Sequence, residues 1–142
     1  GNIGSISDGG GLYIAGIATL RASRVYRNTA GDEGGGIFIQ GGSAILSDCD
    51  IFENQASART ATGGGGLFLW LGSAALDHCR IFNNSAAANG AGAVLHGDAM
   101  LNMCAIYDNT ATNGGGVSVL TDNTVSLTCC TVEDAISGSP TQ

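Results

Sequence analysis

The sequence predicts an all-β fold, a right-handed parallel β-helix of about five coils that forms one domain over residues 1–142. Three observations support this prediction. A glycine-rich block recurs at a nearly constant interval, a short apolar strand follows each block, and like residues recur at fixed offsets from it. A period near 25 residues fits one turn of a solenoid. With 44% hydrophobic residues beside its 24 glycines, the chain can also bury a core.

The glycine blocks mark where each predicted coil begins. Their last glycines are Gly11, Gly36, Gly66, Gly92 and Gly116, which lie 25, 30, 26 and 24 residues apart. Coils therefore start near residues 9, 34, 63, 90 and 114, and residues 135–142 form a tail. The long step carries an insertion at about residues 57–62. We expect the glycines at the corners of the coils, because they adopt backbone conformations that other residues avoid.

Further residues align when they are counted from a leucine about ten positions after each block. The leucines are Leu20, Leu46, Leu76, Leu101 and Leu127. Three positions later stand Ser23, Cys49, Cys79, Cys104 and Cys130; five later stand Val25, Ile51, Ile81, Ile106 and Val132; eight later stand Asn28, Asn54, Asn84, Asn109 and, as an exception, Ala135. The fifth coil departs from the pattern, as terminal repeats often do.

The alternation of side chains along a strand predicts a role for each column. The leucine and Ile/Val columns should face inward. The asparagines could bind sugars or ice, but their fixed corner position favours a ladder of amides that hydrogen-bond to each other and to the turns. The cysteine column is best explained as buried free thiols that fill space, although one disulfide between coils remains open.

Aromatic side chains provide the candidate binding surface. One row, six positions after the leucines, contains Tyr26, Phe52, Phe82 and Tyr107 and should face outward. A second row contains Tyr13, Phe38 and Phe68 and continues through Trp70 and Leu71. Two interpretations stay open. Loops and neighbouring side chains cover these rings, or the rings form a surface that packs against another chain or a sugar.

Catalytic and ligand-binding residues are few. The best acidic cluster is Asp48, Asp50, Asp77 and His78, a weak set for a lyase or glycosidase because it lacks a clear cleft. Opposite charges recur along the stack in Arg24, Asp50 and Arg80, which indicates pairing between coils. No metal-binding cysteine motif is present, so we expect no metal and no cofactor. Asn83 begins the one N-glycosylation sequence, Asn83-Asn84-Ser85.

The recurring Gly-Gly-x-(Ile/Leu/Val) and apolar-x-x-Asn motifs resemble the repeats of chlamydial polymorphic outer-membrane proteins. They are also similar to the wider pectate-lyase-like β-helix superfamily. The resemblance covers about residues 9–134. It implies the β-helix fold and a surface-exposed passenger or adhesin role, but the superfamily also contains lyases, hydrolases and epimerases, so the fold alone does not identify an activity.

Charge and hydropathy limit the function classes. The net charge of −7 and the absence of a basic patch argue against nucleic acid as a partner. No apolar run is long enough to span a membrane. The start at Gly1 lacks the features of a signal peptide, so we expect a processed or excised piece.

Together, these features predict a non-enzymatic, extracellular or cell-surface structural or adhesive module that self-assembles or belongs to a larger surface protein. Its expected partner is a protein, with carbohydrate as a second partner class. The alternatives are a carbohydrate-active β-helix enzyme and an ice-binding solenoid, the latter because of the mixed column Thr29, Gln55, Ser85 and Thr110.

Overall fold

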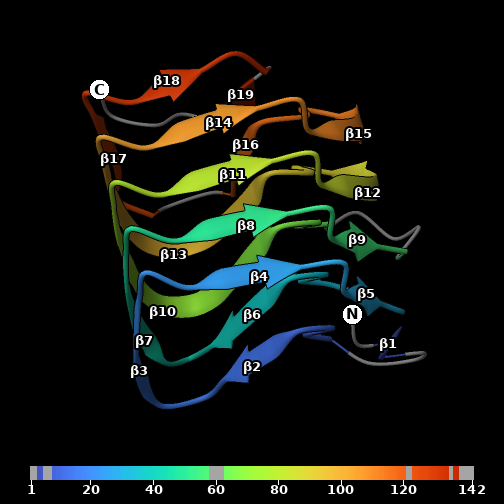
Figure 1. The fold of residues 1–142 in the computed structure, drawn as a ribbon, viewed down its shortest axis with the longest axis horizontal. Coiled ribbons are helices and arrows are strands. Elements are labelled where there is room, and N and C mark those ends of the chain that lie inside the picture. The colour runs from blue at the N-terminus through green and yellow to red at the C-terminus, as the bar shows by residue number, and fades with distance from the viewer. Residues whose placement is uncertain (1–2, 5–7, 58–62, 121–122, 135, 138–142) are drawn as a thin grey trace.

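In the computed structural model, the chain winds into a stack of coils whose strands pair in parallel with those of the coils before and after (Figure 1). The structure describes all residues except 1–2, 5–7, 58–62, 121–122, 135 and 138–142. The described residues contain strands and no helix, which confirms the predicted all-β class. Most of the predicted insertion, residues 58–62, lies outside the described residues.

Three sheets run along the stack. Sheet A contains β1 (Ile3–Gly4), β5 (Thr29–Ala30), β9 (Gln55–Ala56), β12 (Ser85–Asn89) and β15 (Thr110–Asn113). Sheet B contains β2 (Leu12–Ile14), β3 (Ile17–Arg21), β6 (Ile37–Gln40), β7 (Ser43–Ser47), β10 (Leu67–Asp77), β13 (Ala93–Asn102), β16 (Val117–Val119), β17 (Val125–Thr128) and β19 (Ile136–Ser137). Sheet C contains β4 (Arg24–Tyr26), β8 (Asp50–Phe52), β11 (Arg80–Phe82), β14 (Ala105–Tyr107) and β18 (Thr131–Val132).

The coil count is slightly lower than predicted. Each of the first four coils contributes to all three sheets, whereas the described part of the fifth contributes only β16, β17 and β18. Residues 136–137, which the sequence assigned to a tail, form β19 and pair with β16. The structure therefore has about four complete turns, with a fifth that is partly formed.

The predicted inward columns form one continuous core. In sheet C, Val25, Ile51, Ile81, Ile106 and Val132 pair in register from coil to coil. The middle members, such as Ile51 and Ile81, are fully buried. Burial of one such side chain stabilises the fold by about 1.5–3 kcal/mol, so the repeated columns supply much of its stability.

The expected role of the glycines is confirmed at one corner only: each block places one glycine in the left-handed region, with φ between 54° and 69°, at Gly9, Gly34, Gly64, Gly90 and Gly114. Two corners are turned by other residues in the left-handed region, with φ between 46° and 55°. They are Ala22, Asp48, His78, Met103 and Cys129 at one corner, and Arg27, Glu53, Asn83 and Asp108 at the other. The glycines that follow in each block let the coils approach closely. A Cβ on Gly35 would lie 2.4 Å from the Gln55 carbonyl oxygen and 2.5 Å from that of Gly65.

The asparagine column forms the predicted ladder at the second of these corners, directly after Arg27 and its counterparts. The amide nitrogens of Asn28, Asn54 and Asn84 each donate to the side-chain oxygen of the asparagine in the next coil, over 3.0 Å. Their backbone N–H groups donate to the same oxygens. The row ends on Asp134, whose carboxylate accepts from the backbone and side chain of Asn109. The sequence pattern missed Asp134 because it lies one position before the aligned Ala135.

Candidate functional site

Sheet C carries a stacked row of rings on its outer face, which we call the aromatic row: Tyr26, Phe52, Phe82 and Tyr107. Adjacent ring centroids lie 5.0, 4.9 and 5.2 Å apart, and the ring planes differ by only 3–4°. The rings stack because the register places the same column position in each successive strand. Tyr26 is 42% exposed, whereas Phe52 is 7% exposed. Phe52 must therefore be removed from the candidate surface, and the row exposes Tyr26 most, with Phe82 and Tyr107 half-buried.

Two arginines lie against this row. The Arg24 guanidinium lies 5.5 Å from the Tyr26 ring centre and 5.0 Å from that of Phe52, while Arg80 lies 5.8 Å from Phe82. Arg80 also donates two hydrogen bonds of 2.7 Å to the Asp50 carboxylate. Cation–π contacts of this kind stabilise by about 0.5–1 kcal/mol at exposed sites. Arg80 and Asp50 therefore form the charge pairing that the sequence predicted, whereas no such pair joins Arg24 to Asp50 among the described ion pairs.

The second predicted row differs from the expectation. Phe38 and Phe68 point away from the main core but are only 2% and 0% exposed, and they form a separate cluster with Val94, Trp70 and Leu120. The turns before their strands lie over them: a Cβ on Gly34 or Gly64 would come within 2.7 Å of the Phe38 or Phe68 Cβ. Both phenylalanines must therefore be removed from the candidate surface, and the interpretation that loops and neighbours cover these rings applies to them.

The other members of that row lie nearer the surface. Tyr13 is 53% exposed and its hydroxyl donates to the side-chain oxygen of Gln40. Trp70 is half-buried and meets the His96 ring edge to face, with centroids 4.4 Å apart. Leu71 is 52% exposed. These residues do not make a row of stacked rings comparable with that on sheet C.

The weak catalytic candidates lie near one corner, where β7 and β10 lead toward β8 and β11. His78 Nδ1 lies 3.0 Å from the Asp77 carboxylate, and Asn102 donates a 2.6 Å hydrogen bond to Asp77. The Asp77 hydrogen bond, with Asp48 as a weaker influence, raises the pKa of His78. Asp50 instead faces Arg80. The side chains of Asp77 and His78 are about half exposed, so the cluster is brought together but lies on an open corner.

The cysteine column lies inside the core as free thiols. Cys49, Cys79 and Cys104 are buried, Cys130 is half-buried, and Cys129 is exposed. The thiols of Cys79, Cys104 and Cys130 donate to the carbonyl oxygens of Leu46, Leu76 and Leu101 in the preceding coils. Burial raises the pKa of Cys49, so this thiol stays protonated at neutral pH. The structure thus supports the space-filling interpretation.

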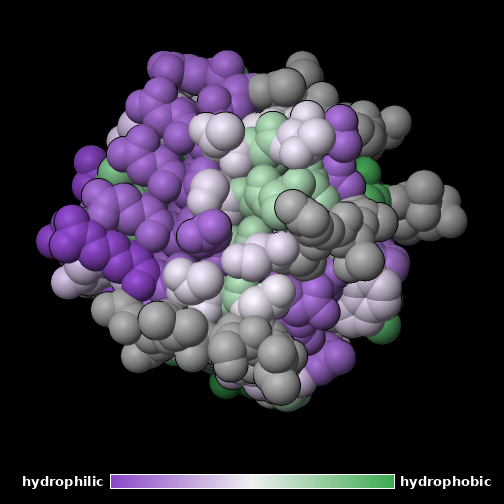
Figure 2. Space-filling view, turned by 90° about the vertical axis from the view of Figure 1, so that its right-hand side faces the viewer, coloured by the Kyte–Doolittle hydropathy of each residue, from purple (hydrophilic) through white to green (hydrophobic). Residues whose placement is uncertain are grey.

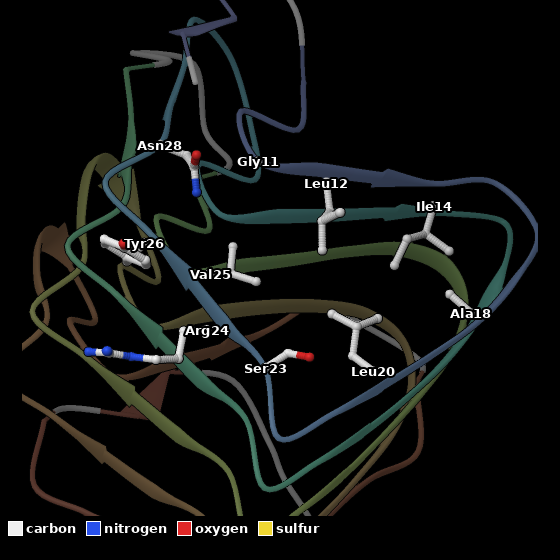
Figure 3. A pocket seen from close by; sticks show the side chains of 10 residues that line it. All are labelled: Gly11, Leu12, Ile14, Ala18, Leu20, Ser23, Arg24, Val25, Tyr26 and Asn28. Carbon is white, nitrogen blue, oxygen red and sulfur yellow. The ribbon is translucent and has the colours of Figure 1, made fainter. Parts of the chain in front are cut away.

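A hollow of about 520 Å³ opens at the first coil (Figure 3). Leu12, Ile14, Leu20 and Val25 point into it, whereas Arg24 and Tyr26 point outward from the same coil. The cause is the position of this coil in the stack. Within the described residues, β2, β3 and β4 each pair with a strand on one side only. The repeat pattern does not predict this hollow.

The side that carries sheet A is mixed in character. In Figure 2, an apolar area borders hydrophilic residues across this side. The column Thr29, Gln55, Ser85 and Thr110 runs along it, in β5, β9, β12 and β15. Asn83, the predicted glycosylation site, is exposed at a nearby corner. Neither the ice-binding nor the glycosylation prediction is tested by this geometry.

Comparison with known families settles the class of protein. The family model described as "Right handed beta helix region" matches residues 2–133. The chain belongs to the right-handed β-helix family. For this β-helix, the predicted fold and handedness are thereby confirmed, and the pectate-lyase-like likeness is consistent with them. The resemblance to chlamydial polymorphic outer-membrane proteins remains unconfirmed.

A search of curated proteins and a search of solved structures each found no significant match to this chain. A search of the described residues also found no helix with the length and hydropathy needed to cross a membrane.

Proposed function

We propose that this β-helix is a non-enzymatic structural or adhesive module that works outside the cell and binds a protein surface through sheet C. The aromatic row and its arginines carry the proposal. Rings held at intervals of about 5 Å by the strand spacing form a rigid surface, so little side-chain freedom is lost when a partner binds. Tyrosine and arginine are also the residues enriched in protein interfaces.

The ring geometry favours protein over carbohydrate as the partner. A sugar packs against the face of an aromatic ring, but each inner ring of the row uses both faces to stack on its neighbours. The exposed groups include Tyr26 and the Arg80 side chain, which pairs with the less exposed Asp50 carboxylate. These groups suit the mixed polar and apolar contacts of a protein interface.

An adhesion assay tests this proposal. Beads coated with the chain are added to a panel of cell types that have been treated with protease, with glycosidases or left untreated. We expect binding that protease abolishes, that glycosidases leave intact and that Arg80→Ala weakens. Arg27→Ala is the matched control, because it also removes an exposed ion pair, that with Glu53, but lies at the corner beyond the row. Loss of binding after glycosidase treatment alone would contradict a protein partner.

The enzyme alternative has its own test. Asp50 is neutralised by Arg80, and Asp77 is occupied by His78 and Asn102, so neither of these two predicted carboxylates is free of a partner. We expect no turnover of a panel of acidic and neutral polysaccharides. Reproducible turnover that Asp77→Asn abolishes would overturn the non-enzymatic proposal.

A further inference from the structure

On the outer face of sheet B, exposed apolar side chains stand in the middle of the stack. Among the described residues of the second to fourth coils, the large apolar side chains that stay exposed are Ile45, Leu71, Met100 and Met103. Ile45 and Met100 are 46% and 67% exposed and occupy one column, on either side of the short Ala75. Strands β7, β10 and β13 each pair with a strand on both sides, so this exposure does not arise from an end of the stack.

A groove of about 490 Å³ opens over Ala75, between Ile45 and Met100. Residues of β7, β10 and β13 line it, together with Thr124, which directly precedes β17. These strands stack side by side (Figure 1), so the groove runs from the second coil to the fifth, which is about 14 Å at the usual strand spacing. An extended peptide of about four residues has the same length. The volume lies within the range of roughly 300–1,000 Å³ that is typical of ligand sites.

One edge of the groove is polar. Asp98 lies two residues before Met100 on the same exposed face, and its carboxylate accepts a 3.0 Å hydrogen bond from the Thr124 backbone N–H. Among the ion pairs of the described residues, none includes Asp98. In the neighbouring strands, the Ser73 hydroxyl donates to the Ser43 hydroxyl over 3.0 Å, so both serine oxygens can accept a further hydrogen bond. The groove therefore combines an apolar floor with an edge of hydrogen-bond acceptors.

The charges around the groove favour a cationic ligand. Strands β7, β10, β13 and β17 contain no lysine or arginine, whereas Asp77 and Asp98 both lie on them. Asp77 already contacts His78 and Asn102, so Asp98 is the carboxylate that remains for a ligand. The net charge of −7 on the whole chain also attracts cations. An acidic polymer would be repelled and is therefore a poor ligand for this groove.

We propose that this groove binds an extended segment of another protein through a lysine side chain. The aliphatic stem of the lysine packs over Ala75 between Ile45 and Met100, and its ammonium group reaches the carboxylate of Asp98. Methionine side chains adapt readily to the shape of such a ligand. The proposal concerns sheet B, so it adds a second binding surface to the one proposed on sheet C.

Two observations select a lysine from a different protein. An ammonium group is a compact charge that one carboxylate oxygen and neighbouring hydroxyls can satisfy, whereas the planar guanidinium of arginine prefers both oxygens of a carboxylate. One oxygen of Asp98 already accepts from Thr124, which favours the ammonium. The 142 residues contain no lysine, so this stretch of a second copy could not supply the side chain.

A peptide titration followed by NMR tests the proposal. The probe is a blocked peptide, acetyl-Val-Ala-Lys-Ala-Val-amide, and its control is the same peptide with an acetylated lysine, which carries no charge. We expect the lysine peptide to shift the amide signals of Ala75 and Met100. It should bind at least about tenfold more tightly than the control, because only the ammonium can pair with Asp98. Added salt should weaken the binding.

Variants of the chain locate the contact. Asp98→Asn removes the charge but keeps the oxygen that accepts from Thr124, and it should weaken binding of the lysine peptide at least about tenfold. Asp108→Asn is the matched control, because it makes the same change on an exposed corner outside the groove, and it should leave binding unchanged. Ala75→Leu, checked for folding by circular dichroism, fills the groove without changing its charge and should abolish binding.

The outcomes that overturn the proposal are no binding of the lysine peptide, equal binding of the acetylated control, and unchanged binding by Asp98→Asn or by folded Ala75→Leu. Pentylamine that binds as tightly as the peptide would show that the groove takes a free amine rather than a protein segment, and would also overturn it. Arg80→Ala, which tests the surface on sheet C, should leave peptide binding unchanged, so the two proposals fail separately.

Discussion

Replacement of Asn84 by alanine should be among the most destabilising single changes in this chain. Its side chain is 1% exposed and makes four hydrogen bonds. The oxygen accepts from the backbone and side chain of Asn54, and the amide nitrogen donates to the Ile51 carbonyl and to the Asn109 oxygen, all over 3.0 Å. At about 1 kcal/mol each, these bonds contribute about 4 kcal/mol. That is a large part of the usual 5–15 kcal/mol of domain stability.

Urea unfolding followed by circular dichroism measures this loss. Asn83→Ala is the matched control, because it makes the same chemical change one residue earlier on an exposed side chain. The control should lower the free energy of unfolding by about 1 kcal/mol or less. This loss is expected because asparagine adopts the left-handed corner conformation more readily than alanine does. If Asn84→Ala and Asn83→Ala lower the free energy of unfolding by the same amount, the hydrogen bonds of the ladder do not stabilise the fold and this prediction is refuted.

Three other predictions follow from the close packing of the coils and from burial. Gly35→Ala should unfold the chain or lower its free energy of unfolding by more than about 3 kcal/mol, because the added Cβ would clash with backbone atoms. Gly16→Ala places its Cβ in open space, so it should leave stability unchanged or raise it in the same urea assay. Burial, helped by nearby acids, raises the pKa of Glu33 to about 7. Since the unfolded chain loses that proton near pH 4.5, stability should fall by about 1 kcal/mol as pH rises from 4.5 to 7, and a Glu33→Gln variant that keeps the same slope would refute this origin. A thiol reagent should label Cys129 rapidly and the buried Cys49, Cys79 and Cys104 only at the rate of unfolding; fast labelling of all of them would contradict the packed column.

The repeat was sufficient to predict the sheets because each coil packs equivalent residues against the coils next to it. Columns such as Ile51 and Ile81 must face inward, since a shift of one residue would expose the whole set. The same logic identified the asparagine ladder and the stacked aromatic row. These features depend only on the residue type and on the distance between repeats.

Features that break the repeat could not be predicted in this way. The burial of Phe38 depends on the path of the preceding turn, and strand alternation does not describe that path. Asp134 joins the ladder from a shifted position, which an alignment of equal offsets misses. The αL corners at Met103 and Glu53 carry no sequence signature, because the side chains point outward and many types fit.

The asparagine ladder also has a direction. In every pair, the earlier coil donates and the later coil accepts, so the amide dipoles align along the axis with their positive ends toward the fifth coil. At that end the row meets the carboxylate of Asp134. An anion at the positive end of aligned dipoles is the arrangement that stabilises the first turn of an α-helix. This all-β chain thus closes its row of side chains by the same electrostatic rule that caps a helical backbone.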